Sequence, residues 1–301
     1  MTAPTVSVIM PAYNSERYVE EAVESILNQS FSDFEFIIID DGSTDTTLAR
    51  LGRHAERDRR IRLSSRPNTG VAKALNEAAS LVRGRYIARM DADDVSAPHR
   101  LERQVNYLEQ HPECVVVGSA VVLTDPDGWP LRTMGVKQRH EEIDSAHLRG
   151  EGGAIVHGAA MFRTDALRAI GGYVLRIDED QDLLLRLAEH GQVANLPDVL
   201  LYYRQHAKSV GHQRYRELVR SVRVAVAEAR VRRGLPPLED SEPLALETSA
   251  APNKTLHKKW AWWALSAGYP KSARKHALLA LREAPLSLES WRVAYCALRG
   301  R

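Results

Sequence analysis

The chain has 301 residues, of which 44% are hydrophobic and 27% charged, and its formal net charge is +2. These values are ordinary for a globular protein, with room for one large domain and a smaller appendage. No apolar run approaches the roughly 20 residues needed to cross a bilayer, and the N-terminus carries no secretory signal. The two cysteines, Cys114 and Cys296, form no metal motif. Together these features predict a protein of the reducing cytoplasm.

The charge is unevenly distributed along the chain. Residues 211–301 contain 17 Lys+Arg and 8 Asp+Glu, a balance of +9, whereas residues 1–210 contain 24 and 31, a balance of −7. We therefore expect the two parts to have different roles. Nucleic-acid binding is not expected, because most of the chain is acidic and no recognition motif is present.

The first 90 residues alternate predicted strands and helices. Short apolar runs predict strands at 5–10, 34–39, 61–64 and 86–90. Amphipathic spacing predicts helices at 16–29, 46–57 and 71–81. Ser15 is expected to cap the first of these helices. This alternation is typical of a parallel, doubly wound α/β sheet.

The rest of the chain is less regular and becomes helical after residue 211. Further strands are predicted at 115–123, 155–162 and 199–203, and a turn at 126–128. Further helices are predicted at 98–110, 178–190, 255–267, 271–283 and 288–298, with a short one that Thr164 caps and that ends at Gly171. Residues 236–252 form a polar linker that contains proline.

Polar or turn-forming residues follow three of the predicted N-terminal strands. Pro11, Asp41 and Asp91 each stand at the carboxyl end of such a strand. Ligands of doubly wound sheets bind beyond these ends. The sequence therefore predicts one shared site at this edge of the sheet.

Three carboxylates, Asp91, Asp93 and Asp94, follow the strand at 86–90. Clustered carboxylates repel one another and lose solvation free energy, so we expect a cation to neutralise them. Two carboxylates with room for phosphate oxygens and waters suit Mg²⁺ or Mn²⁺. A solvated acidic turn is the alternative.

Three ordered segments lie within about residues 5–210: VSVIMPAYNSERYVEEAVESILNQSFSDFEFIIIDDGSTDTT, NTGVAKALNEAASLVRGRYIARMDADD, and DEDQDLLLRLAEHG followed by LLYYRQH. In these segments the chain resembles the family-2 nucleotide-sugar glycosyltransferases of the GT-A fold. This resemblance implies a GT-A catalytic domain at 1–210, with a nucleotide-binding half at 1–95 and an acceptor-side half at 96–210. Residues 211–301 would then be a helical C-terminal extension.

The resemblance also implies an activity. A metal-dependent, inverting enzyme would move a sugar from a nucleotide-diphosphate sugar, above all a UDP-sugar, to a glycan or lipid-linked acceptor in cell-surface polysaccharide synthesis. Around the nucleotide base and ribose it places four consecutive residues, Pro11, Ala12, Tyr13 and Asn14. Among them Tyr13 offers a stacking face.

Further donor contacts are implied on the next two loops. Asp41 is expected to accept the N3–H of uracil, whereas Asp40 would cap the following turn. Asn68, Gly70 and Lys73 stand at a predicted helix start, which suits the diphosphate or ribose. A solvated lysine is the alternative for Lys73.

The Asp-X-Asp motif is expected to hold the cation. Asp93 would bind Mn²⁺ or Mg²⁺ directly, while Asp91, with Ala92 beside it, would contact the ribose, the ion or its water. Asp94 is expected to be structural. His206 resembles a family position that completes the metal or diphosphate site, although a loop histidine without such a role is the alternative.

The general base is expected on the helix at 178–190. The resemblance assigns it to Asp180, which would take the proton from the acceptor hydroxyl as that oxygen attacks the anomeric carbon. Glu179 and Asp182 are alternatives, and Arg186 could balance the acidic charge. One base and a metal-held leaving group imply direct displacement with inversion.

Two positions bear on the acceptor. His157 resembles a family position that lines the acceptor side. Gln181 stands where the family usually has a bulky, often aromatic residue, which predicts an altered acceptor pocket.

Two other functional classes are alternatives to a glycosyltransferase. A sugar-1-phosphate nucleotidyltransferase would need a glycine- and arginine-rich loop after the first strand, where this chain has PAYN, and a catalytically dead binding module should lack Asp93 or Asp180.

The C-terminal helices combine basic and aromatic residues. The set comprises Trp260, Trp262, Trp263, Tyr269, Lys258, Lys259, Lys271, Arg274 and Lys275. Such helices can lie on an anionic membrane surface, which predicts peripheral contact at the inner face of the membrane. A packed helical subdomain with core tryptophans is the alternative, and an oligomer is left open.

Overall fold

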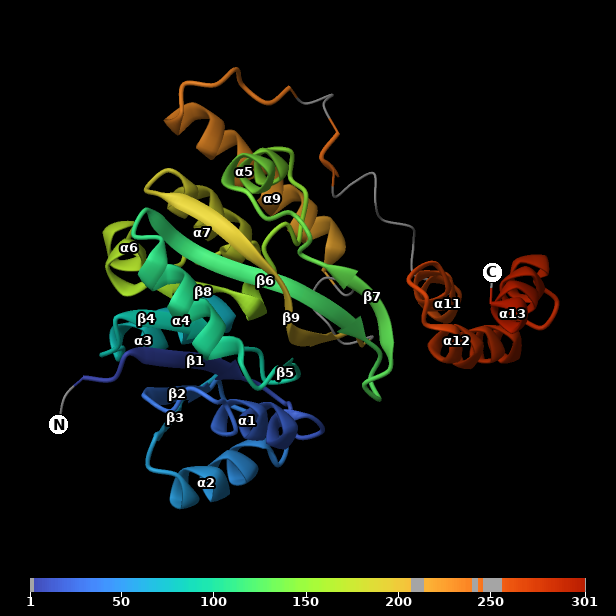
Figure 1. Ribbon diagram of the computed structural model, residues 1–301, viewed down its shortest axis with the longest axis horizontal. Helices are drawn as coiled ribbons and strands as arrows, with labels where there is room; N and C mark the ends of the chain where they lie inside the picture. The colour runs from blue at the N-terminus through green and yellow to red at the C-terminus, as the bar shows by residue number, and fades with distance from the viewer. Residues whose placement is uncertain (1–2, 207–213, 240–242, 246–255, 301) are drawn as a thin grey trace.

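The computed structural model describes residues 3–206, 214–239, 243–245 and 256–300. One sheet forms its centre, in the strand order β3-β2-β1-β4-β8-β6-β9-β5, with β7 paired to β6 (Figure 1). The strands are β1 Val6–Ala12, β2 Phe34–Asp40, β3 Ile61–Ser65, β4 Tyr86–Arg89, β5 Val95–Ser96, β6 Cys114–Thr124, β7 Pro130–Met134, β8 Met161–Arg163 and β9 Gln192–Arg204.

The sheet is mostly parallel. β1 pairs in parallel with β2 and β4, β2 with β3, and β6 with β9. Because β8 is antiparallel to both β4 and β6, strands β6 and β9 run in the same direction as β1. Among the described strands only β5, β7 and β8 run the other way. This arrangement confirms the doubly wound α/β fold predicted from the sequence.

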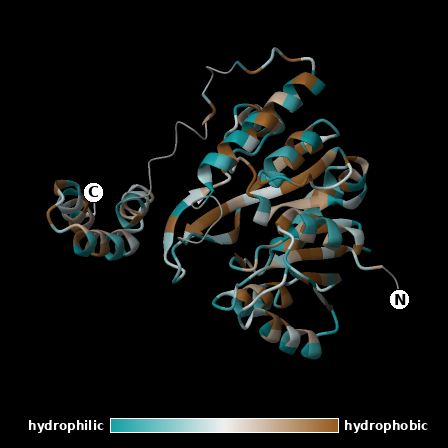
Figure 2. Ribbon diagram, turned by 180° about the vertical axis from the view of Figure 1, so that it is seen from behind, coloured by the Kyte–Doolittle hydropathy of each residue, from teal (hydrophilic) through white to brown (hydrophobic). Residues whose placement is uncertain are grey.

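Helices cover both faces of the sheet. Their bounds are α1 Val19–Leu27, α2 Thr47–Arg57, α3 Val71–Ser80, α4 Arg100–Gln110, α5 His140–Leu148, α6 Thr164–Ala169, α7 Glu179–Ala188, α9 Tyr215–Arg232, α11 Leu256–Ser266, α12 Pro270–Glu283 and α13 Leu288–Arg299. Alternate residues of β1 serve opposite layers: Val8 and Met10 pack with α1 and α4, and Ile9 packs with α3 and α7. Figure 2 shows the central strands in hydrophobic colours.

Three details of the sequence prediction are wrong. The predicted strand 155–162 is a 3₁₀ turn, η1 His157–Ala159, followed by the short β8. Ser15 does not cap α1 with its side chain, because its hydroxyl donates to the Tyr13 carbonyl instead. The Thr164 hydroxyl likewise donates to the Gly84 carbonyl, 2.8 Å away, and caps no helix. Each hydroxyl thus donates to a backbone carbonyl and accepts from no amide of the helix that follows it.

The helices after residue 211 pack in two separate places. α9 packs against α5 and α7, around the buried side chains of Leu185, Val222 and Val226. α11, α12 and α13 form a cluster with Leu123 of β6 and Leu131 of β7, at the β7 end of the sheet (Figure 1). The predicted linker 236–252 lies largely outside the described residues. The domain boundary at residue 210 therefore stays a prediction.

Much of the basic and aromatic set of α11 and α12 is used internally. Trp260 is buried in the helical cluster, and Trp262 and Trp263 pack partly against it. Lys258 is also buried, and its Nζ donates to the Ser287 hydroxyl, 2.9 Å away. These contacts fit the packed-subdomain alternative. No helix within the described ranges is long and apolar enough to cross a membrane.

A buried carboxylate attaches the helical cluster to the sheet. Asp125, directly after β6, is fully buried, forms an ion pair with Lys275, and lies 3.0 Å from Nε2 of His276. His276 in turn lies 2.9 Å, Nδ1 to Nδ1, from His257 of α11. Burial alone would raise the pKa of Asp125, but the hydrogen bonds from His276 and Lys275 outweigh it and hold that pKa well below its usual range.

We predict that Asp125→Asn loosens the attachment of α11–α13. The amide oxygen can still accept from the Asp127 and Trp129 N–H groups, both 2.9 Å from Oδ1, but the charge facing Lys275 is lost. The free energy of unfolding should fall by about 2–3 kcal/mol, as measured by urea denaturation followed by tryptophan fluorescence. The contribution should be fully present above the unfolded pKa of about 3.9 and disappear as the pH falls towards the lowered folded pKa.

Asp127→Asn is the matched control. Asp127 also contacts Lys275, at 2.9 Å, but its side chain is 56% exposed. Solvent screening should keep its effect below about 1 kcal/mol. Equal losses for the two variants would contradict the anchoring role of Asp125.

Candidate functional site

The carboxyl ends of β1, β2 and β4 meet at one edge of the sheet, as the sequence predicted. The Asp41 N–H donates to the Ala12 carbonyl, 2.8 Å away, which joins the ends of β1 and β2. Asn14 has a left-handed backbone with φ of 47°. Its Oδ1 accepts from the Thr44 N–H at 2.8 Å, and so the loops after both strands are tied together. Tyr13, half exposed, leaves its ring face open to a ligand.

Asp41 organises the loop before α3. Its buried carboxylate accepts from the N–H groups of Thr69 and Gly70, at 3.1 and 2.8 Å, and forms an ion pair with Arg66 at 2.8 Å. Gly70 has φ of +98°, a conformation that favours glycine. The same segment carries Asn68 and Lys73, both exposed. Asp41, Asn68 and Gly70 are thus brought onto neighbouring loops and Lys73 onto the first turn of α3, together with Arg66, which the sequence analysis missed.

Asp40 has the structural role that was predicted for it. Its carboxylate accepts from the Ser43 N–H at 3.4 Å and from the Ser65 hydroxyl at 2.8 Å. These bonds hold the turn after β2 against β3.

The Asp-X-Asp carboxylates face different partners. Asp91 forms an ion pair with the buried guanidinium of Arg89. Oδ2 of Asp93 lies 2.8 Å from Nε2 of His206. Asp94 is fully buried, accepts from the Arg204 N–H at 2.8 Å, and has a second oxygen that no donor among the described residues reaches.

The end of β9 clamps this loop. Arg204 donates from Nε to the Asp93 carbonyl at 2.8 Å and packs its guanidinium over the Tyr18 ring, 4.6 Å from the centroid. The His206 ring also stacks on the Tyr18 ring, with 5.7 Å between the two ring centroids. His206, 113 residues from Asp93 in sequence, is therefore placed by defined contacts.

The arrangement fits a small divalent cation in part. Carboxylate oxygens and an imidazole nitrogen suit Mn²⁺ or Mg²⁺, and the Asp93 and His206 side chains are partly exposed, at 29% and 20%. Across the described ranges, no three His, Cys, Asp or Glu side chains form a ready metal cluster. An ion here would have two protein ligands and would depend on ligand oxygens for the others, which is usual for Mg²⁺.

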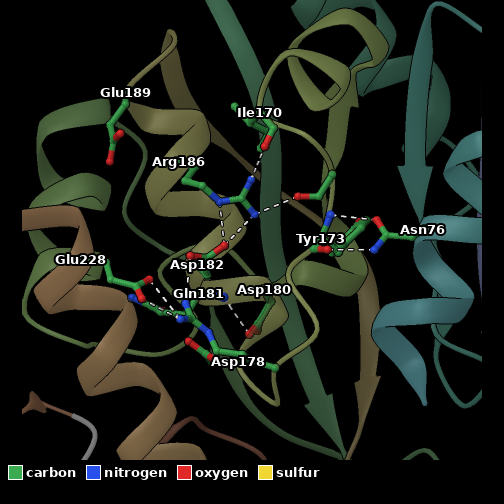
Figure 3. Close-up of polar contacts among 12 residues, drawn as sticks. Asn76, Ile170, Tyr173, Asp178, Asp180, Gln181, Asp182, Arg186, Glu189 and Glu228 are labelled. Atoms are coloured by element: carbon green, nitrogen blue, oxygen red, sulfur yellow. Dashed lines mark hydrogen bonds and ion pairs between the residues drawn. The ribbon is translucent and has the colours of Figure 1, made fainter. Parts of the chain in front are cut away.

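The acidic residues in the first turn of α7 have different partners (Figure 3). Asp182 is buried between Arg176 at 3.0 Å and Arg186 at 2.6 Å. Asp180 makes no ion pair within the described part of the chain, and its Oδ1 accepts from the Gln181 N–H at 2.8 Å. Asp182 is therefore committed to structure, with Arg186 balancing it as predicted, whereas the Asp180 carboxylate remains available.

Gln181 does not face Asp180. Its side chain is buried and turns to α5, where Nε2 donates to the His147 carbonyl at 2.8 Å and Oε1 lies 3.2 Å from His147 Nδ1. The expectation that Gln181 alters the acceptor pocket is therefore not supported by its position. It joins α7 to α5, a helix that the sequence analysis did not predict.

Burial changes the proton affinity of the α7 carboxyls. Burial, and then the neighbouring Asp180 charge, raise the pKa of Glu179 to about 8. Burial also raises the pKa of Asp180, while the Gln181 N–H opposes the shift. Near neutral pH, one carboxyl of this pair keeps a proton and the other is ionised, because two adjacent buried charges are unfavourable.

Arg89 is the buried cation that interacts with both Asp91 and the acidic first turn of α7. Burial alone would lower the pKa of Arg89, but Asp91 first, then Tyr173 and Glu179, raise it above its usual value. Gly158 of η1 packs against the same region, where an added Cβ would lie 3.0 Å from Asp91 Oδ2. His157, expected on the acceptor side, lies buried 3.1 Å from the Tyr173 hydroxyl. A charged residue inside an apolar strand was the one available sequence signal for Arg89.

The chain matches the family model described as "Glycosyl transferase family 2" over residues 7–180. It is 34% identical over 209 residues to the O-antigen biosynthesis glycosyltransferase WbnJ of Escherichia coli. The aligned region covers 68% of this chain and 81% of that protein. Asp41, Asp93 and Asp180 all lie within the matched family region.

Two solved structures show the same fold. The chain resembles S. aureus TarS 1-349 in complex with UDP-GlcNAc, with a TM-score of 0.60, 18% identity, and coverage of 100% of this chain and 93% of that one. It also resembles the mannosyltransferase PcManGT from Pyrobaculum calidifontis in complex with GDP-Man and Mn²⁺, with a TM-score of 0.56, 22% identity, and coverage of 100% and 86%. At these identities the likeness establishes the GT-A fold.

We predict that Arg89→Met is far more damaging than its size suggests. Removing the guanidinium leaves Asp91 and the α7 pair without their buried cation, and breaking a buried pair costs about 3–5 kcal/mol. Thermal unfolding should show a correspondingly large loss of stability. Arg85→Met is the control, because Arg85 pairs with Glu109 while 60% exposed and should cost less than about 1 kcal/mol. Similar losses would refute the role given to Arg89.

Proposed function

Because the chain belongs to glycosyl transferase family 2, we propose that it moves a sugar from a nucleotide-diphosphate sugar to an acceptor hydroxyl with inversion. The observation that carries this proposal is the division of the acidic residues at one sheet edge. Asp93 faces His206, while the unpaired Asp180 stands on α7, across the buried Arg89. Asp93 and His206 are suited to bind a cation, and Asp180 is suited to accept a proton.

The donor is proposed to lie along the loops after β1 and β2. Tyr13 would stack on the base, with Pro11 and Ala12 bringing the backbone to it. Asp41 would accept an imino proton of the base, since a carboxylate has about four acceptor sites and its known contacts leave capacity for one more. UDP is the nucleotide that this assignment favours. Asn68, Gly70 and Lys73 would lie near the ribose and diphosphate.

The cation is proposed to be held by Asp93 and His206. Asp91, with Ala92, would contact the ribose or the ion's water, because its own carboxylate is engaged by Arg89. When bound, Mn²⁺ or Mg²⁺ would neutralise the charge that develops on the departing diphosphate. Arg204 holds the loop that presents Asp93, through its bond to the Asp93 carbonyl.

The proton is proposed to pass to Asp180. This carboxylate has no ion-pair partner among the described residues and a raised pKa, two properties of a general base. Its Oδ1 is held by the Gln181 N–H, which fixes its orientation. The acceptor oxygen would attack the anomeric carbon as its proton moves to Asp180, and the diphosphate would leave from the opposite face.

The acceptor is proposed to be a glycan or lipid-linked saccharide of cell-surface polysaccharide. The similarity to an O-antigen biosynthesis enzyme supports this class. Family membership does not favour the nucleotidyltransferase alternative. The presence of both Asp93 and Asp180 likewise does not favour a dead binding module.

We expect nucleotide release from a panel of UDP- and GDP-sugars to require Mn²⁺ or Mg²⁺. A UDP-sugar should be turned over best, EDTA should abolish release, and calorimetry should show UDP binding at least about tenfold tighter with Mn²⁺. Asp93→Asn should remove this metal effect.

Asp127→Asn is the control here, because Asp127 is an exposed aspartate of a loop outside this cluster. It should keep the metal effect of the wild type. If wild-type UDP affinity is the same with Mn²⁺ and with EDTA, the proposed cation role of Asp93 and His206 is wrong. If no nucleotide sugar is turned over with the metal present, the transferase proposal itself fails.

We expect Asp180→Asn to lower kcat by roughly 10²–10⁴-fold while donor affinity stays nearly unchanged. The asparagine oxygen can still accept the Gln181 N–H, so the loss would be chemical. In the wild type, kcat should fall as the pH drops through the raised pKa of Asp180, since only the ionised carboxylate can accept a proton. Steady-state kinetics across pH would measure both effects.

Two neighbouring carboxyls provide controls. Asp182→Asn should lower stability, because it breaks contacts with Arg176 and Arg186. Glu179→Gln should keep most of the turnover, because this carboxyl holds a proton near neutral pH. A variant Glu179→Gln that loses turnover while Asp180→Asn keeps it would reassign the base.

A further inference from the structure

α13 has an apolar stripe that belongs to none of the hydrophobic clusters of the described chain, although its Trp291 indole N–H donates to the Pro285 carbonyl at 2.8 Å. Four large side chains at spacings of three, four and three residues lie on one side of the helix. They are Leu288, Trp291, Tyr295 and Leu298, with 88%, 59%, 56% and 69% of their surface exposed. The opposite side of α13 supplies Val293, Ala294 and Ala297 to the core of the helical cluster. Internal packing therefore explains one face of α13 but not the other.

The exposed face is basic as well as apolar. At about 100° per residue, Arg299 projects within about 40° of Leu288 and Tyr295, and Arg292 within about 60° of them. Both arginines are exposed, and the Arg299 guanidinium lies over the Tyr295 ring, 4.7 Å from its centroid. Neighbouring α12 adds three exposed cations, Lys271, Arg274 and Arg282.

Acidic residues are few near this face. Residues 256–300 contain eight Lys+Arg and two Asp+Glu. Glu289 lies 3.8 Å from the Lys258 amine, and Glu283 lies 3.5 Å from His257. α13 is also the helix of the cluster that lies farthest from the sheet in Figure 1. The surface is thus open, apolar along its centre and positive along its flank.

We propose that the outward face of α13 docks reversibly on an anionic lipid bilayer. Leucines would enter the acyl boundary, Trp291 and Tyr295 would lie at the headgroup level, and the arginines would meet lipid phosphates. A second copy of the chain fits less well. Pairing two such stripes would bring Arg292 and Arg299 of one copy close to the same arginines of the other, in a segment where residues 256–300 hold eight basic residues and two acidic ones.

The docking surface is distinct from the donor site. Only its purpose rests on the proposed function: it would hold the chain where a lipid-linked acceptor is found. Binding to lipid and binding to UDP are therefore separate measurements, and either can fail without the other.

Co-sedimentation of the full chain with vesicles tests the proposal. Phosphatidylcholine vesicles that contain phosphatidylglycerol should bind the protein at low salt, and binding should fall with ionic strength. Pure phosphatidylcholine should bind it less. Brominated lipids should quench tryptophan fluorescence, and the quenching should diminish in Trp291→Phe, because the other tryptophans of the cluster are more deeply packed.

Two double variants separate charge from apolar contact. Arg292→Gln with Arg299→Gln should lower the partition coefficient about fivefold per arginine. Trp291→Gln with Leu298→Gln should lower it by at least as much. The matched control is Leu175→Gln with Val231→Gln, two residues that are 63% and 74% exposed elsewhere and should leave vesicle binding unchanged. Circular dichroism verifies folding, and UDP affinity should be unaffected in all three.

Several results would overturn the proposal. The wild-type protein could remain in the supernatant with anionic vesicles at low salt, or both α13 variants could bind like the wild type. Sedimentation velocity could instead show a dimer that the α13 variants dissociate while lipid binding persists. That last outcome would identify the stripe as a contact between two copies of the chain.

Discussion

The site depends on one electrostatic constraint, the gathering of carboxylates at the end of β4 in a largely buried position. Such groups cannot be ionised together without positive charge close by. Three arginines from three different elements provide it: Arg89 of β4, Arg100 of α4 and Arg204 of β9. Arg100 is fully buried, and its guanidinium donates to the Arg89 carbonyl at 2.6 Å, beneath the acidic loop. The pairing of β5 with β9, which brings the end of β9 to the loop after β4, is therefore also what makes the acidic loop tolerable.

These arginines also divide the carboxylates by role. Asp91 is neutralised by Arg89, Asp94 is held by the Arg204 N–H, and Asp93 is left facing His206. The same division recurs on α7, where arginines engage Asp182, whereas Asp180 forms no ion pair among the described residues. A motif of adjacent acidic residues thus becomes a set of distinct groups only through partners that lie far away in sequence. Preorganised charge of this kind acts on a developing charge without reorganising during the reaction.

The parts of the fold that were predictable are those with a strong local pattern. β1, β2 and α3 follow from continuous apolar runs and helical spacing, and the carboxylates follow from their position at strand ends. β5 has two residues, β7 begins at Pro130, and α5 carries few apolar positions, so none gave a periodic signal. η1 was misassigned because its apolar sequence suits a strand, while the close approach of Gly158 to Asp91 requires a turn. Arg89, Arg100 and Arg204 were missed because an isolated basic residue has no periodic pattern.

Net charge along the sequence is similarly a poor guide until the partners are known. The +9 balance of the C-terminal part includes Lys258 and Lys275, yet the first is buried beside Ser287 and the second is bound to Asp125. These charges attach the helical cluster internally and to the sheet, and they have little capacity left for an external partner. The charges that remain available are those on the outer sides of α12 and α13. What distinguishes that surface is that arginines without an ion pair in the described part of the chain coincide with an exposed apolar stripe, since either feature alone is common on protein surfaces.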